Sequence, residues 1–344
     1  MSVTIKDVAK LAKVSTTTVS HVLNETRFVS EESKAAVLSA VKALNYAPSA
    51  VARSLKVKNT KTLGMLVTTT LNPFYAEVIK AVEKNCYREG YNLVLCNTDG
   101  DPEKTDSYLK MLLQKRTDGI LVMCTEYDNG LFKAITAQRD LPMVVMDWGP
   151  TDEYLDRIQD NSSLGGLIAT QHLIENGHTD IGFIGGPSNK IPALGRYDGF
   201  KQAMANAGLT INPDWVIESD FECEGGKLAM RQLLAQDQKP SAVFIANDTM
   251  ALGALSEAQL SGIRVPEDLS VIGYDNISFS AHFYPPLTTI NQPKNRLAKM
   301  AVHTLIERLE HPRKQGRTLL IEPDLVVRSS VAKVAQKNKL PQKK

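Results

Sequence analysis

The chain has 344 residues, 43% of them apolar, a length that exceeds the usual size of one hydrophobic core and predicts two or three folding units. Its net charge of +2 hides an uneven distribution: residues 1–60 carry nine basic and four acidic side chains, and residues 61–328 carry 26 and 34. The last sixteen residues add five lysines and no acidic residue. A basic N-terminal segment and a basic tail therefore flank an acidic body, which suggests an anionic partner.

The sequence carries no signal for a membrane, for export or for a metal. No run approaches the roughly 18 apolar residues of a membrane span, and the first residues lack the apolar core of a signal peptide. The six histidines show no metal-like spacing, and the four cysteines show no C-x-x-C pattern: Cys86, Cys96, Cys124 and Cys223. We expect a cytoplasmic protein with buried free thiols, no metal and no cofactor.

Residues 1–47 predict a three-helix head. Thr4 and Asp7 form a capping-box pattern at the start of a first helix, Ser15 can cap a second helix, and Ser30 a third. Apolar residues recur at helical spacing in each segment. The segment AKVS leaves about three residues between the first two helices, the length of a tight helix-turn-helix joint.

The second helix begins with three threonines, although threonine is a mediocre helix former. In a helix-turn-helix, the first residues of the second helix meet base edges in the major groove of DNA, where hydroxyls and imidazoles can form hydrogen bonds. We therefore predict that Thr16, Thr17 and His21 contact DNA, with Arg27 beside them. The alternative is an ordinary solvated polar face.

Residues 48–60 predict a short hinge helix and linker. Val51 and Leu55 are four positions apart, and a helix this short is unstable alone in water. The pattern suits a helix that forms against a second copy of the chain on DNA, where Leu55 can enter the minor groove while Arg53 and Lys56 hold phosphates. The alternative is a plain linker.

From residue 61 onward, predicted strands alternate with predicted helices in two successive series. This pattern indicates an α/β body of two doubly wound parallel-sheet subdomains. The expected divisions are a first subdomain of about 61–161 plus 292–322, a second of about 162–291 plus 323–332, and a basic tail of 333–344.

Polar residues close or follow several of these strands, where ligands of parallel sheets bind. The polar candidates are Asn72, Asp147, Arg196, Asn247 and Asp275. Aromatic residues that can stack on a ligand are Phe74, Tyr75, Trp148 and Phe221. Each Asn or Asp alone is more often a turn or helix cap, but their recurrence at strand ends favours a shared site for a sugar-like polyol.

Enzymes are not expected, because neither G-x-G-x-x-G nor G-x-x-x-x-G-K-[ST] occurs in the chain. A transport protein would share the two-subdomain core but not a DNA-reading head. The segments TIKDVAKLAKVSTTTVSHVLN, PSAVARSLK, IGYDN and PPLTTINQP closely resemble the lactose-repressor family of bacterial transcription regulators. The resemblance implies a homodimer on a palindromic operator in double-stranded DNA, and a cleft whose ligand alters DNA affinity.

Within this family, the segments NPFY, LVLCNTDGD and IQDNSSLGG most resemble the ribose operon repressors, with the purine repressors next. The expected effector is therefore D-ribose, which would release the operator and control ribose uptake and use. The alternative is a purine-responsive repressor with hypoxanthine or guanine as corepressor.

The core is also similar to periplasmic ribose-binding protein, whose ligand contacts match the polar and aromatic candidates above. The same similarity adds Gln292, although Asn291 would fit with a shift of one position. Trp148 stands where the binding protein has an arginine, and Leu194 where close ribose repressors have one, which leaves the exact sugar open.

Overall fold

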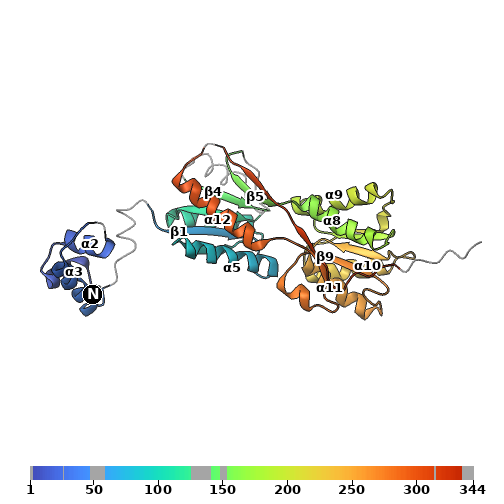
Figure 1. Ribbon diagram of the computed structural model, residues 1–344, viewed down its shortest axis with the longest axis horizontal. Helices are drawn as coiled ribbons and strands as arrows, with labels where there is room; N and C mark the ends of the chain where they lie inside the picture. The colour runs from blue at the N-terminus through green and yellow to red at the C-terminus, as the bar shows by residue number, and fades with distance from the viewer. Residues whose placement is uncertain are drawn as a thin grey trace, which may run out of the picture. The chain divides into compact units, whose positions relative to one another are not determined.

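Figure 1 shows the computed structural model, which describes residues 3–25, 27–46, 59–124, 141–147, 153–313 and 315–334. The chain forms two compact units, Met1–Thr60 and Lys61–Lys344. Four of the predicted site residues lie outside the described residues: Arg53, Leu55, Lys56 and Trp148.

The first unit contains three helices: α1 (Ile5–Ala12), α2 (Thr16–Asn24) and α3 (Glu31–Ala43). Their caps are those expected. The Asp7 carboxylate accepts hydrogen bonds from the Thr4 N–H (2.8 Å) and hydroxyl (2.7 Å), and the Ser15 Oγ accepts from the Thr18 N–H (3.0 Å). Between α1 and α2, Lys13 has a φ of 55°, a left-handed conformation that glycine adopts more easily.

Small apolar side chains from all three helices form the core of this unit: Val8, Ala9, Val19, Val22, Val37 and Ala40. Because these residues are short, α1 and α2 approach closely across the tight turn, as a helix-turn-helix requires. The helix-turn-helix prediction is confirmed. Both helices depend on the third to close their apolar faces.

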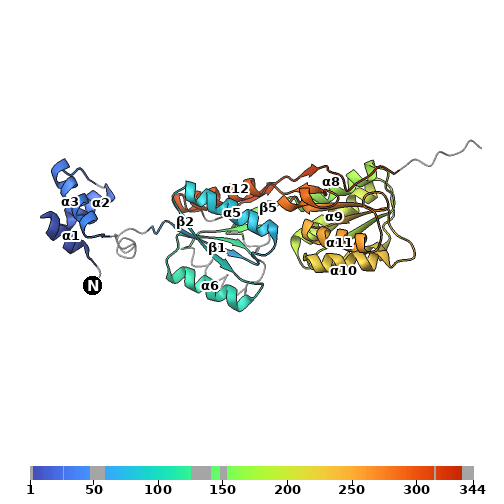
Figure 2. The same ribbon diagram turned by 90° about the horizontal axis from the view of Figure 1, so that it is seen from below.

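The second unit begins with a six-stranded sheet in the order β11-β5-β4-β3-β1-β2, in which every neighbouring pair is parallel. Its strands are β1 (Thr62–Val67), β2 (Asn92–Asn97), β3 (Gly119–Met123), β4 (Met143–Met146), β5 (Asp156–Asp160) and β11 (Thr318–Ile321). Successive residues of β1 face opposite cores, Met65 toward α5 (Pro73–Arg88) and α12 (Lys294–Glu310), and Leu66 toward α6 (Pro102–Gln114). Figure 2 shows these helices on the two faces of the sheet.

The second sheet has the order β12-β10-β9-β8-β6-β7, and only the pair of β10 and β12 is antiparallel. Its strands are β6 (Ile181–Gly185), β7 (Val216–Glu218), β8 (Ala242–Ile245), β9 (Ser270–Asp275), β10 (Thr288–Asn291) and β12 (Asp324–Val326). Its helices are α8 (Ser162–Glu175), α9 (Ile191–Asn206), α10 (Cys223–Leu234) and α11 (Asp248–Leu260), with short 3-10 turns at Pro213–Trp215 and Ser278–His282.

The chain passes between the two sheets three times: from β5 to α8, from β10 to α12 and from β11 to β12. The fold-class prediction of two doubly wound parallel-sheet subdomains behind an all-α head is confirmed. None of the described helices is both long and apolar enough to span a membrane.

The burial of the cysteines needs one correction. Cys86, Cys96 and Cys124 are buried as expected, but Cys223 is exposed. It is the first residue of α10, where the helix begins at the surface and only its later residues pack inward.

Candidate functional site

A cavity of about 180 Å³ opens between the two sheets of the second unit. Residues from both sheets line it, and seven of them are predicted site residues: Asn72, Phe74, Tyr75, Arg196, Phe221, Asn247 and Asp275. The remaining lining residues are Thr68, Thr69, Pro187, Lys190, Asp220 and Glu222. A small ligand can therefore reach side chains of both subdomains at once.

The wall from the first sheet is aromatic and neutral. Asn72 caps α5, because its Oδ1 accepts a hydrogen bond from the Phe74 N–H at 3.0 Å. Phe74 and Tyr75 meet edge to face, with ring centres 6.0 Å apart. Asn72 is thus both a helix cap, the ordinary role of such a residue, and part of the cavity wall.

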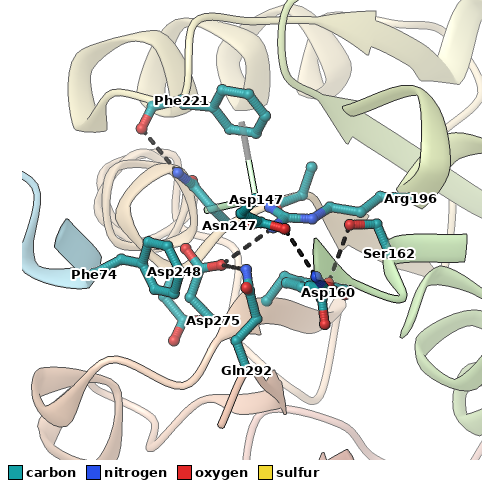
Figure 3. Close-up of polar contacts among 12 residues, drawn as sticks. Phe74, Asp147, Asp160, Ser162, Arg196, Phe221, Asn247, Asp248, Asp275 and Gln292 are labelled. Atoms are coloured by element: carbon teal, nitrogen blue, oxygen red, sulfur yellow. Dashed lines mark hydrogen bonds and ion pairs between the residues drawn. The ribbon is translucent and has the colours of Figure 1, made fainter. Parts of the chain in front are cut away.

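The wall from the second sheet carries the charges, and Arg196 of α9 is its centre. This side chain is only 1% exposed. Its guanidinium contacts the Asp275 carboxylate at 3.4 Å (Figure 3). It also donates to the Ala246 carbonyl and lies 3.8 Å from the centre of the Tyr274 ring. The Arg196 Nε is buried without a hydrogen-bond partner in the described part of the chain. It is therefore a buried donor whose hydrogen bond is unmade among the described residues.

Close packing of α8 against α9 fixes the position of this arginine. A Cβ atom on Gly166 would lie 2.2 Å from the Arg196 carbonyl oxygen, and one on Gly199 would lie 2.1 Å from the Ser163 carbonyl oxygen. Only glycine permits this approach at either position. The glycines of α8 and α9 thus allow the close helix packing that places the Arg196 guanidinium at the cavity.

Asp275 ends β9 with a φ of 106°. Its Oδ1 accepts a hydrogen bond from the Gln292 Nε2 at 2.9 Å. Burial raises the pKa of Asp275 to about 6, although the positive charges of Arg196 and Lys294 oppose the shift. The carboxyl group is therefore mostly ionised at pH 7 and mostly protonated at pH 5.

Asn247 and Phe221 hold each other at the cavity. The Asn247 Oδ1 accepts from the Met250 N–H at 2.8 Å, which caps α11, and its Nδ2 donates to the Phe221 carbonyl at 2.9 Å. Phe221 has a φ of 69°, and the Arg196 guanidinium lies 5.8 Å from the centre of its ring. The amide of Asn247 thus fixes the aromatic wall.

Asp147 and Gln292 lie behind the cavity and are not among the described residues that line it. The Asp147 Oδ1 accepts from the Asp160 N–H at 2.9 Å. Asp160 in turn accepts from the Ser162 hydroxyl at 3.0 Å and from the Tyr274 hydroxyl of the second sheet. Burial and the neighbouring negative charge raise the pKa of Asp147, and burial raises that of Asp160.

Asn291 and Gln292, the two residues offered for one ligand position, have different partners. The Asn291 side chain is hydrogen-bonded to Asn276 and Asp324, whereas Gln292 is 2% exposed and contacts Asp275. The Gln292 Oε1 has no partner within the described ranges.

In the head, Thr16 and Thr17 are exposed at the beginning of α2, and His21 lies half-buried one turn further along. Thr18 differs from its neighbours, because its hydroxyl pairs with the Ser15 hydroxyl at 2.9 Å. Arg27 is exposed after the helix. Two threonines of the run are therefore presented to solvent and the third completes the cap.

Two sequence families match this chain. Residues 4–49 match the family described as "Bacterial regulatory proteins, lacI family", and residues 170–331 match the "Periplasmic binding protein-like domain". The "HTH-type transcriptional repressor PurR" of Histophilus somni is 56% identical over 95% of this chain and 98% of its own length. The chain belongs to the lacI family.

Solved structures of lacI-family regulators agree with the fold. The lac repressor dimer bound to operator and an anti-inducer has a TM-score of 0.88 at 28% identity, over 96% of this chain and all of its own. A lacI-family regulator from Enterococcus faecium with bound ribose has a TM-score of 0.72 at 28% identity, over 80% of this chain and all of its own.

These comparisons correct the effector expected from the sequence. The relatives that are 53–56% identical over nearly the whole chain are named PurR repressors, so the expectation of a ribose-released repressor is wrong. The short ribose-like segments are outweighed by this full-length similarity. The expectation that the protein is a regulator and not an enzyme is confirmed by the same relatives.

Proposed function

We propose that this lacI-family regulator represses transcription as a homodimer on a palindromic operator, and that a purine base, hypoxanthine or guanine, is its corepressor. The observation that carries the proposal is the identity of 53–56% to PurR repressors over 95–96% of the chain. The division of labour is a head of residues 1–47, a hinge of 48–60 and an effector-binding and dimerising core of 61–332.

The cavity supports a flat heterocyclic ligand. Phe74, Tyr75 and Phe221 provide aromatic surfaces for stacking, which a purine ring uses over its whole face. Both charged side chains line the cavity, where the Arg196 guanidinium is a donor and the Asp275 carboxylate is an acceptor. A base that carries both a carbonyl and a ring N–H can satisfy the two together.

The residues behind this wall would act indirectly. Gln292 orients the Asp275 carboxylate through its amide hydrogen bond. Asp147 supports the Asp160 backbone, and through Asp160 the Tyr274 ring on which Arg196 stacks. We assign Trp148 to stacking on the ligand, from its sequence alone.

In the head, we assign Thr16 and Thr17 to base edges, and His21 and Arg27 to bases or phosphates at the ends of the contact. The exposure of Thr16 and Thr17 at the beginning of α2, and of Arg27 after the helix, supports this assignment. In the hinge, the sequence assigns Leu55 to the minor groove, and Arg53 and Lys56 to phosphates.

The test is calorimetric titration of the purified protein with hypoxanthine, guanine, adenine and D-ribose, followed by operator binding in the presence of each. The operator is first selected from random duplexes. Hypoxanthine or guanine should bind and tighten the complex with the selected duplex, and D-ribose should do neither. Sugar binding that loosens the complex, or failure of both purines to bind, would overturn the proposal.

A further inference from the structure

The turn that follows β9 has an unusual backbone. Asp275 and Asn276 have φ values of 106° and 50°, and neither residue is glycine. Such conformations are costly for residues with a Cβ atom and persist only where the surroundings hold them in place. Asp275 is also the acidic residue of the cavity, so whatever holds this turn determines where its carboxylate points.

Two side chains of the first subdomain hold the turn from outside. The Lys294 ammonium, at the first residue of α12, donates to the carbonyl oxygens of Asp275 at 2.7 Å and Asn276 at 2.8 Å. Glu77 of α5 accepts from the Ser278 N–H at 2.7 Å and lies 3.4 Å from the Lys294 ammonium. The Lys294 side chain is 12% exposed, so its two bonds to the turn are partly shielded from water and salt.

The other contacts of the turn come from its own subdomain. The Ile277 N–H donates to the buried Asp248 carboxylate at 2.9 Å, and the Asn276 side chain accepts from Arg328 at 2.6 Å. These bonds fix the later residues of the turn. The carbonyl of Asp275 itself is held by Lys294.

We propose that Lys294, together with Glu77, is a positioning residue for the Asp275 carboxylate, and that this clamp joins the effector cavity to the first subdomain. The effector part of this inference rests on the proposed function. Lys294 acts through the backbone of Asp275 and does not line the cavity among the described residues. α5 supplies both Glu77 and, one turn earlier, the aromatic wall of Phe74 and Tyr75, so the clamp ties both walls together.

The first experiment needs no ligand. Hydrogen exchange of the amides of Ile277 and Ser278 is measured in the ligand-free full-length protein and in Lys294→Met. Lys299→Met is the matched control, because Lys299 is an exposed lysine on the same helix. Several-fold faster exchange in Lys294→Met alone supports the clamp, and unchanged exchange overturns it. If Lys294→Met fails to fold, Glu77→Gln replaces it, because it removes the charge opposite the ammonium.

The second experiment is a double-mutant cycle on hypoxanthine affinity by calorimetry. Lys294→Met should weaken binding by roughly ten-fold, or about 1.4 kcal/mol. In the background of Asp275→Ala the same substitution should change nothing further, because its route to the ligand is gone. Equal losses in both backgrounds would show a general structural role and overturn the assignment. If the wild-type protein binds no purine, the proposed function fails, while the exchange measurement still decides the clamp.

Discussion

The head and the effector cavity solve the same problem of presenting polar groups in opposite ways. In the head, Thr16 and Thr17 are exposed on a helix whose core is built from other residues. In the cavity, Arg196 and Asp275 are buried and contact each other. Binding and stability are therefore separable in the head and inseparable in the cavity, because a buried charge that loses its partner destabilises the fold.

The largest expected effect is that of Arg196→Ala. It leaves the buried carboxylates of Asp147, Asp160 and Asp275 without their shared cation. We expect the free energy of unfolding to fall by about 3–5 kcal/mol and purine binding to disappear. Denaturant titration and calorimetry measure the two. An exposed arginine of the same subdomain, replaced by Arg264→Ala, is the control and should change unfolding by well under 1 kcal/mol. A stable Arg196→Ala protein that still binds purine would show that binding and stability are separable in the cavity too.

Thr17→Ala is the counterpart in the head. It should weaken specific operator binding by about 1–3 kcal/mol and leave binding to random duplex unchanged. The free energy of unfolding should move by no more than about 0.5 kcal/mol, because the side chain is exposed. Ser39→Ala, on an exposed position of α3, should affect neither. An equal loss on operator and random DNA would assign Thr17 to positioning rather than base reading.

Stability and purine affinity should both depend on pH through Asp275 of the cavity. The folded-state pKa of Asp275 is about 6 and its ordinary value is 3.8, so its contribution to stability is present below about pH 4 and is lost as pH rises through about 6. Purine affinity should move the other way, about ten-fold stronger at pH 7 than at pH 5, because the ionised carboxylate is the better acceptor. Calorimetry at the two pH values measures the affinity, and Asp275→Asn should abolish the dependence. Affinity that falls as pH rises would contradict this role.

The smallest expected effect, that of Ser30→Ala, tests whether stability and DNA binding are separable within the head. Ser30 caps α3 by accepting the Ser33 N–H at 3.4 Å, away from the predicted DNA contacts. Ser30→Ala should lower the stability of the head by about 1 kcal/mol, seen as a lower thermal midpoint of a fragment or as faster amide exchange in α3. Operator affinity at low temperature should stay unchanged. A large loss of operator affinity there would mean that stability and binding are coupled in the head after all.

Local features of the sequence predicted most of what is local in the structure. The caps at Thr4, Ser15 and Ser30 depend on residues three positions away, and all three were found. Seven cavity residues were found because the carboxyl ends of parallel strands meet along one edge. Thr68 and Thr69 were missed, although they directly follow β1 and the same rule could have found them.

Contacts between distant residues could not be predicted in this way. Tyr274 and Asp160 are 114 positions apart and meet because the chain crosses between sheets, and Lys294 reaches Asp275 for the same reason. The prediction of ribose as the effector was wrong for a chemical reason. Carboxylate, amide and guanidinium groups at strand ends satisfy the hydroxyls of a sugar and the ring edges of a base equally well, so their presence does not distinguish the two ligands.

The three passages of the chain between the sheets also set the order in which parts of the protein can fold during synthesis. Neither subdomain is a contiguous segment, and the first lacks α12 and β11 until residues 294–321 have been synthesised. Until then the apolar face of α5 and β1 that packs on α12 has no cover. During synthesis, the head therefore emerges from the ribosome and can fold on its own core long before the effector-binding core can form.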